Sequence, residues 1–581
     1  MRYPTLYTKE SDRQMVDTFK GYNHNLRIGS GEFFDMKNMT SDYYPVLSPR
    51  KARGVYTDPV NPKGLIAKDN LCYVDGTNFV MNEYRVDMRL NDEPKQLISM
   101  GAYVIIMPDK KYINTLDLTD WGSIEATFST TTDVSFTLCN ISGDTYGEAA
   151  VSETAPVNPE NMDLWIDTSS TPHTLKQYSA TSSIWVSIAT TYIKITATGI
   201  GKAFNQYDGV TISGVLAEEL QDLNASIVIW AKDDDYIVVP GIADHVFTQA
   251  AIAGAVTVER KMPLMDFVTE CNNRLWGCRY GIEDNGQVVN EIYASKLGDF
   301  KNWNCFMGIS TDSWVGSLGT DGQFTGAITH MGFPVFFKEN CLHKVYISSA
   351  GAHQIQDTAC RGVEKGSHRS LAIVNETLFY KARSGVCAYD GALPTEVSYV
   401  LGNEVYQDAV GGANGNKYYI SMKNLQGEYL LFVYDTAKNM WHKEDELQVD
   451  AFCSCRGEMY AVSKGKIITL LGSGTQDTNP VEWMAETGEI GISSPDMKYI
   501  SRLNVRMAMD IGAEVSFYAQ YDFSEEWEPL FSMRGTNLRS FSIPIRPKRC
   551  DNMKLRMEGV GMVKIYSITK TIEQGSDISG P

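Results

Sequence analysis

The stretch Asn70-Leu-Cys-Tyr-Val-Asp-Gly-Thr-Asn-Phe-Val-Met81 decides the fold, because two apolar runs here flank an Asp-Gly turn. This pattern predicts a β-hairpin with a two-residue loop. Residues 102–113 repeat it with a turn at Pro108-Asp109. Similar strands recur at residues 273–277, 334–338, 376–380, 417–421 and 457–461. The later copies lie about 40 residues apart, and most are followed by a second strand that carries a tyrosine and a turn.

A period near 40 residues with several short strands per repeat is typical of a β-propeller. Each four-stranded blade leaves an apolar face that the next blade covers. The alternative is a long antiparallel sandwich, whose hairpins also recur at short intervals. The period favours an all-β fold with a β-propeller of six or seven blades, formed by residues 61–116 and 260–475.

The period is interrupted and then lost. Residues 117–259 are rich in Thr and Ser and contain strand-like runs, which predicts an inserted β-rich module. Residues 476–581 alternate polar with apolar side chains, which predicts a C-terminal β-sandwich. Residues 1–60 are rich in Gly, Asn and aromatic residues with little periodicity, so we expect an N-terminal arm and entry segment.

Composition excludes several classes of protein. The 581 residues are 43% hydrophobic, enough to bury a large core, which argues against disorder. No apolar run approaches the roughly 20 residues of a membrane span. The net charge of −19 argues against tight, sequence-independent binding of nucleic acid. The 11 cysteines are scattered, so we expect reduced thiols and folding in a cytoplasm.

No catalytic or metal-binding motif is complete. The glycines of Gly199-Ile-Gly-Lys202 lack the spacing of a phosphate-binding loop. Cys453 and Cys455, like Cys271 and Cys278, lack the second pair that a zinc site requires. Ser310-Thr-Asp-Ser-Trp314 only partly matches the Asp box of sialidase-like propellers. The sequence therefore predicts no catalytic residue, no cofactor and no metal site.

The basic clusters are modest. Arg546, Lys548 and Arg549 form one cluster in the terminal module, and Arg50, Lys51 and Arg53 form another before the first blade. Both flank prolines, which indicates exposed turns. Arg546, Lys548 and Arg549 are our candidates for contact with DNA or a partner protein, and the alternative is a solvated edge.

Several phrases of the sequence resemble one family. Asn290-Glu-Ile-Tyr-Ala-Ser-Lys-Leu-Gly-Asp-Phe-Lys-Asn-Trp303 is similar to a turn phrase of phage tail propellers. Further stretches similar to the same proteins follow in the same order, namely Phe336–Asn340, Arg361–Ser367, Leu378–Tyr380 and Tyr389–Gly391. The earlier stretch Phe34–Arg50 resembles the entry segment of these proteins. The family is the tail nozzle and packaged-DNA-stabilisation proteins of bacteriophages. The resemblance covers residues 20–115 and 260–475.

This resemblance implies a structural virion protein of the phage tail without enzymatic activity. In that family the subunits form a ring, commonly a hexamer, below the portal and adaptor. The ring retains packaged DNA and acts as its ejection conduit. The expected partners are further copies of the chain, the portal or adaptor, other tail proteins and, transiently, genomic DNA. The expected location is the virion tail, after assembly in the bacterial cytoplasm.

Two other functions stay open. One is a virion receptor-binding or carbohydrate-binding protein, because Trp165, Tyr178, Trp185 and Tyr192 lie in the insertion and aromatic rings stack on sugars. The same residues alternate as core positions do. The other is a propeller glycosidase, which the lack of repeated Asp boxes disfavours.

Overall fold

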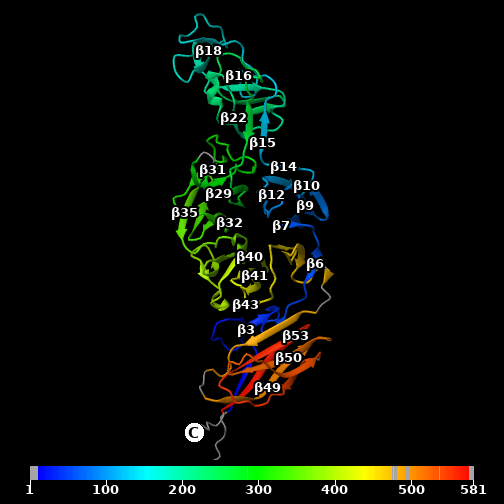
Figure 1. The fold of residues 1–581 in the computed structure, drawn as a ribbon. Helices are drawn as coiled ribbons and strands as arrows, with labels where there is room; N and C mark the ends of the chain where they lie inside the picture. The colour runs from blue at the N-terminus through cyan, green and yellow to red at the C-terminus, as the bar shows by residue number, and fades with distance from the viewer. Residues whose placement is uncertain are drawn as a thin grey trace, which may run out of the picture. The chain divides into compact units, whose positions relative to one another are not determined.

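The computed structural model describes residues 11–283, 286–473, 475–476, 480–492, 496–535 and 537–574. Within these ranges the regular structure is almost entirely β-strand, which confirms the prediction of an all-β fold (Figure 1). The helices described there are short 3₁₀ segments, namely η1 (Glu218–Leu223), η2 (His368–Ser370) and η3 (Tyr399–Leu401). No helix of the described ranges is long and apolar enough to cross a membrane.

The chain divides into two compact units. One comprises Met1–Lys95, Phe336–Leu342 and Asp357–Pro581, and the other comprises Gln96–Val335 and His343–Gln356. Propeller strands occur in both units. The inserted module belongs to the second unit, and the C-terminal sandwich belongs to the first.

Seven sheets among the described residues have the strand order of propeller blades, which confirms the predicted propeller. The first sheet consists of β7 (Pro62–Ala67), β8 (Leu71–Asp75), β9 (Asn78–Met81) and β10 (Tyr84–Asp87). The second consists of β11 (Gln96–Met100), β12 (Tyr103–Met107), β13 (Lys111–Asn114) and β14 (Trp121–Ser123). The third consists of β28 (Phe267–Cys271), β29 (Arg274–Ile282), β30 (Val288–Ala294) and β31 (Trp314–Ser317). The fourth sheet consists of β32 (Phe324–His330), β33 (Phe333–Lys338), β34 (Cys341–Tyr346) and β35 (Gln354–Ala359). The fifth consists of β36 (Ala372–Val374), β37 (Thr377–Ala382), β38 (Gly385–Tyr389) and β39 (Thr395–Glu396). The sixth consists of β40 (Tyr406–Asn414), β41 (Lys417–Asn424), β42 (Tyr429–Asp435) and β43 (Met440–Lys443).

The seventh sheet combines strands from distant parts of the sequence. Its order is β44 (Ala451–Cys455), β45 (Glu458–Ser463), β46 (Lys466–Thr469), β6 (Gly54–Thr57) and β47 (Thr475–Gln476). Strand β6 precedes the first blade and pairs antiparallel with β46 of the last. Backbone hydrogen bonds therefore tie the segment before the propeller to its final blade.

The inserted module contains three sheets, which confirms that the insertion is β-rich. Two of them pack around a common apolar core that includes Phe136, Ile195 and Val258. Their orders are β15 (Ala126–Ser129), β27 (Thr257–Arg260), β22 (Gly209–Ser213) and β23 (Ser226–Val228); and β24 (Ala231–Asp233), β25 (Tyr236–Pro240), β21 (Tyr192–Thr196), β16 (Val134–Cys139) and β26 (Phe247–Gln249). The third consists of β17 (Ala150–Ser152), β18 (Leu164–Asp167), β19 (Thr174–Ser179) and β20 (Ile184–Ser187).

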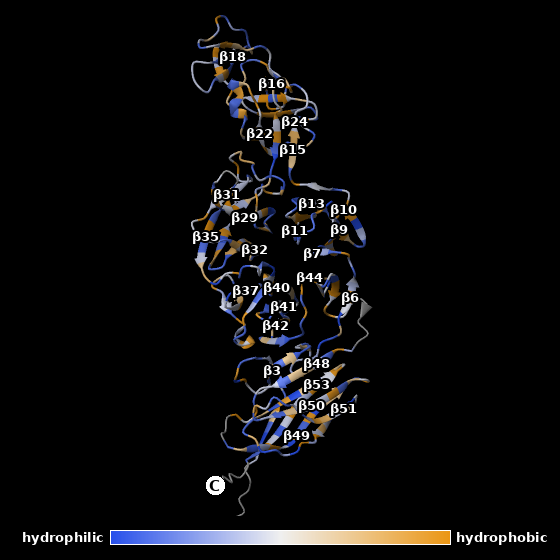
Figure 2. Cartoon of the chain, viewed as in Figure 1, coloured by the Kyte–Doolittle hydropathy of each residue, from blue (hydrophilic) through white to orange (hydrophobic). Residues whose placement is uncertain are grey.

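The C-terminal strands form the predicted sandwich, and N-terminal strands complete both of its sheets. One sheet is β1 (Ser11–Val16), β54 (Val563–Gln574), β49 (Lys498–Met509) and β52 (Arg539–Ile543). The other is β2 (Gly21–Tyr22), β3 (Glu32–Lys37), β48 (Glu482–Thr487), β53 (Met553–Val560), β50 (Glu514–Tyr521) and β51 (Glu528–Arg534). The short strands β4 (Met39–Thr40) and β5 (Ser48–Pro49) pair with each other. Alternate residues of β49 and β50 are buried, and Figure 2 shows the matching change of hydropathy along these strands.

All 11 cysteines are free thiols in the structure. Burial raises the pKa of Cys72 and of Cys453 to about 12, so these thiols stay protonated at neutral pH. We therefore expect alkylation under denaturing, non-reducing conditions to modify 11 thiols, as counted by intact mass. A mass that shows fewer modified thiols, restored by prior reduction, would reveal a disulfide.

His442, on β43, is buried and uncharged. Burial lowers its pKa to about 3, and the nearby ammonium of Lys417 acts in the same direction. An unfolded histidine binds a proton below about pH 6.5, whereas folded His442 does so only near its lowered pKa. We therefore expect the free energy of unfolding to fall as the pH drops below about 6.5, and His442→Gln to flatten that slope. Urea titrations between pH 4 and pH 8 measure both slopes.

Candidate functional site

The basic cluster of the terminal module is exposed, as expected for a turn. Arg546, Lys548 and Arg549 lie between β52 and β53. The Lys548 ammonium lies 2.5 Å from a carboxylate oxygen of Glu528 and 4.8 Å from the ring centre of Tyr521. Lys548 is thus already paired within the chain, and contact of this cluster with DNA or a partner stays a prediction.

The incomplete motifs have local structural roles. A Cβ at Gly201 would lie 1.9 Å from the carbonyl oxygen of Asp233, so close backbone packing requires glycine there. Asp312, in the partial Asp box, accepts hydrogen bonds from the N–H groups of Met307, Gly308 and Ile309 and stabilises their turn. The described residues contain no group of three His, Cys, Asp or Glu side chains placed to hold a metal ion.

Aromatic residues gather on one face of the β17–β20 sheet. Because side chains alternate between the faces of a strand, Trp165, Tyr178 and Trp185 share this face with Lys176 and Asp167. The register confirms the arrangement, since Trp165 pairs with Lys176 and Tyr178 pairs with Trp185. We call these five residues the aromatic face.

Trp185 contacts the two other rings of the aromatic face, with interplanar angles of 67° to Trp165 and 59° to Tyr178. The ring centres of Trp165 and Trp185 are 5.4 Å apart, and those of Tyr178 and Trp185 are 5.3 Å apart. The Trp165 side chain is only 5% exposed, and its indole N–H donates a hydrogen bond to the carbonyl oxygen of Ser152. Trp185 and Tyr178 are half-buried and present part of their rings to solvent.

A charged pair lies beside the rings. Lys176 Nζ is 4.6 Å from the ring centre of Trp165 and 2.7 Å from Asp167 Oδ2. Hydrogen bonds from Lys176 and Ser169 lower the pKa of Asp167 to about 2. The carboxylate is therefore ionised at neutral pH and offers a fixed acceptor next to a fixed donor.

The opposite face of the same sheet carries its apolar core. Ile166 and Leu175 are buried there with Leu138 of β16. Tyr192, the fourth aromatic residue singled out in the sequence, lies on β21 in another sheet and contacts Trp230 with ring centres 5.9 Å apart. The structure thus brings together three of the four aromatic residues, and it adds Lys176 and Asp167, which sequence reasoning missed.

Comparisons with known proteins return solved structures alone. No family model and no curated protein matches the chain. An exo-β-1,3-galactanase from Phanerochaete chrysosporium matches with 6% identity and a TM-score of 0.21, covering 52% of this chain and 95% of the galactanase. A family 43 arabinoxylan arabinofuranohydrolase from Bacillus subtilis matches with 10% identity and a TM-score of 0.14, covering 52% and 94%. A puromycin hydrolase matches with 9% identity and a TM-score of 0.23, covering 75% and 61%.

These matches contradict two predictions made from the sequence. The matched proteins are hydrolases, several of them glycoside hydrolases, and not components of a phage tail. On this comparison the predicted DNA conduit of a virion tail and the predicted lack of enzymatic activity are wrong. At 6–10% identity and TM-scores of 0.14–0.23, these matches assign no activity to this chain. The family resemblance, the ring assembly, the partners and the location stay predictions.

Proposed function

We propose that the chain binds carbohydrate on the aromatic face. One observation carries the proposal. Trp185 and Tyr178 lie partly exposed on the same sheet face as the Lys176–Asp167 pair. This combination offers an apolar ring surface and hydrogen-bonding groups within one small area.

The chemistry of a sugar fits both components. One side of a pyranose ring carries C–H groups, which pack against the flat face of an indole or phenol ring. The edge of the sugar carries hydroxyls, each able to donate and to accept hydrogen bonds. Lys176 donates and Asp167 accepts, so the pair can bind adjacent hydroxyls and fix the orientation of the sugar.

The two faces of the sheet support a division between core and binding surface. Ile166 and Leu175 supply the buried contacts of the sheet, and the buried Trp165 contacts Trp185. Trp185 lies on β20, the last strand in the sheet order, where one side of the strand has no neighbour in this sheet. Its partial exposure at an edge is consistent with a ring that receives a ligand.

Replacing Trp185 with alanine is expected to weaken carbohydrate binding about tenfold or more, because the stacking surface is lost. A glycan array of neutral and acidic oligosaccharides identifies the ligand, and calorimetry with that oligosaccharide measures the dissociation constant. Trp185→Phe should retain part of the affinity, since it keeps a ring at the same position.

The matched control is Trp121→Ala, on β14 of the same compact unit. Trp121 is 39% exposed and lies outside the aromatic face, so its removal should leave the affinity unchanged. Melting curves check that both variants fold. Absence of binding to every glycan at millimolar concentration, or equal affinity of Trp185→Ala and the wild type, would refute the proposal.

A further inference from the structure

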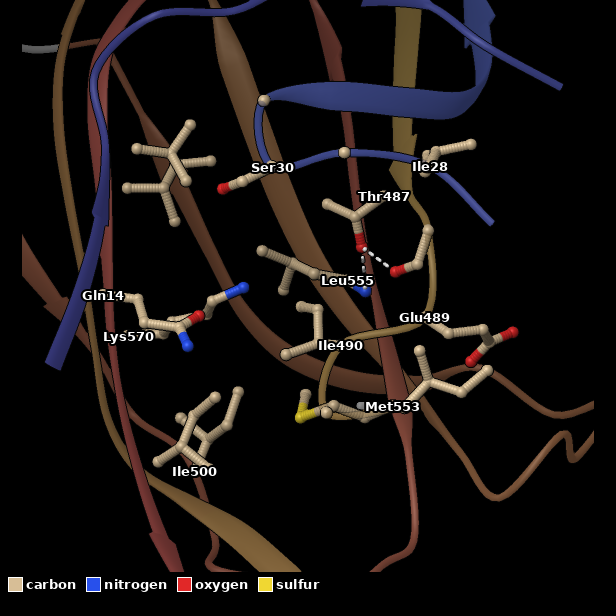
Figure 3. A pocket seen from close by; sticks show the side chains of 18 of the residues that line it. Gln14, Ile28, Ser30, Thr487, Glu489, Ile490, Ile500, Met553, Leu555 and Lys570 are labelled. Atoms are coloured by element: carbon tan, nitrogen blue, oxygen red, sulfur yellow. Dashed lines mark hydrogen bonds between the residues drawn. The ribbon is translucent and has the colours of Figure 1, made fainter. Parts of the chain in front are cut away.

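A pocket of about 750 Å³ opens between the two sheets of the C-terminal sandwich (Figure 3). Its volume lies in the range of roughly 300–1,000 Å³ that is usual for small-molecule sites. The walls come from β1, β3, β49, β53 and β54 and from segments 27–31 and 487–492. All of these elements belong to one compact unit.

The walls are mostly apolar because they are the inner faces of the sandwich. The apolar residues of the lining include Ile490, Ile500, Leu503, Met553, Leu555 and Ile568. Several of them are almost fully buried, including Leu503 at 1% and Leu555 at 2% exposure. The pocket is therefore a continuation of the apolar core that protein atoms leave unfilled.

The ammonium group of Lys570 lies beside this apolar surface. Lys570 lies on β54 between Ile568 and Ile572, and all three side chains line the pocket. Figure 3 shows the Lys570 side chain beside Gln14, directed into the space bounded by Ile490 and Leu555. Gln14 is its direct cross-strand neighbour on β1.

Lys570 has no hydrogen-bond or ion-pair partner among the residues that the structure describes. Burial lowers the pKa of its ammonium, while the Asp12 carboxylate nearby acts in the opposite direction. A cation inside an apolar cavity is costly unless an opposite charge compensates it. The described protein atoms supply no such partner in contact with it.

Thr487, Glu489 and Glu32, which also line the pocket, each have at least one partner. The Thr487 hydroxyl donates to the carbonyl oxygen of Gly488 and accepts from the N–H of Leu555. Glu489 Oε1 lies 3.6 Å from the ammonium of Lys554, while its Oε2 is buried without a hydrogen-bond partner among the described residues. Glu32 accepts hydrogen bonds from Asn23 and from the backbone of Gly29. Of the two lysines that line the pocket, Lys498 donates to the carbonyl oxygen of Gly491, whereas half-buried Lys570 has no partner among the described residues.

We infer that this pocket binds a long-chain carboxylate, with its hydrocarbon chain between the two sheets and its carboxylate on Lys570. The chain would replace water on the apolar walls, and the carboxylate would supply the missing counter-charge. This site is separate from the aromatic face, and the inference does not depend on carbohydrate binding.

Calorimetry with sodium dodecanoate and with dodecan-1-ol tests the inference on the full chain. We expect the carboxylate to bind about tenfold or more tightly than the alcohol, because only the carboxylate compensates Lys570. Lys570→Met should abolish this preference, and Lys570→Arg should retain it. The methionine side chain suits the apolar pocket, so the variant is expected to fold, which melting curves verify.

The matched control is Lys564→Met on the same strand. Lys564 Nζ lies 4.5 Å from the ring centre of Tyr43, away from the pocket lining, so its removal should leave both affinities unchanged. Equal affinity for acid and alcohol, or no binding of either, would overturn the inference. An unchanged preference in Lys570→Met would do the same, as would acetate binding as tightly as dodecanoate.

Discussion

Replacing Arg53 with alanine is expected to cost about 3 kcal/mol of stability in the last blade, because buried Glu444 and half-buried Asp445 lose their closest cationic partner. Arg53 donates to Asp445 Oδ2 at 2.6 Å and to Glu444 Oε2 at 2.7 Å. Burial alone would raise the pKa of Asp445, yet the neighbouring Arg53 holds it below its usual value. The ion pairs are largely shielded from water, since the Arg53 side chain is 13% exposed.

The loss of stability should be largest at β6, because this strand directly follows Arg53 and completes the last blade. Hydrogen exchange of a peptide that contains residues 54–57 should accelerate by about a hundredfold, since 1.4 kcal/mol corresponds to a factor of ten. Lys51→Ala is the control, because Lys51 is exposed and lies in the same basic cluster. Equal exchange in Arg53→Ala and Lys51→Ala would show that these ion pairs do not hold β6.

The repeats were predictable because each blade is encoded locally. The hairpin at residues 70–81 carries its own turn and alternation, and β8 and β9 form where the sequence indicates. The number of blades was not decided by the period. One strand of the seventh sheet, β6, comes from the segment before the first blade, and local patterns do not report such distant pairing.

The aromatic face was partly predictable from alternation. Tyr178 and Trp185 lie in neighbouring strands, where a hairpin fixes which residues share a face. Tyr192 lies in a strand with the same alternation, but that strand, β21, belongs to another sheet, where it pairs with β16 and β25. Which sheet a strand joins depends on distant partners, so the sequence alone placed all four aromatic residues in one group.

The pocket was not predictable, because a β-bulge changes the face on which Lys570 lies. The register between β49 and β54 shifts by one residue between the pairs of Ser567 and Ile565. Strict alternation from the buried Ile565 would direct Thr569 and Thr571 inward. The bulge instead directs Ile568, Lys570 and Ile572 into the pocket.

A buried ion pair connects the inserted module to a propeller segment within one compact unit. Arg260, at the end of β27, pairs with Asp208 and donates from Nε to the carbonyl oxygen of Ile124. Asn302, in the segment between β30 and β31, donates to Asp208 Oδ1 at 2.9 Å and accepts from the N–H of Gly209 at 2.9 Å. The Arg260 and Asp208 side chains are only 6% and 3% exposed.

Arg260→Ala is therefore expected to lower the free energy of unfolding of this unit by about 4 kcal/mol, because Asp208 would remain as an unpaired buried charge. Urea unfolding followed by tryptophan fluorescence measures the change. Lys261→Ala is the matched control, since Lys261 is 66% exposed and its pair with Glu259 should contribute less than about 1 kcal/mol. The double variant Asp208→Asn, Arg260→Met should recover part of the loss, because it removes both charges. A double variant less stable than Arg260→Ala would show that the arginine acts through packing and not through its charge.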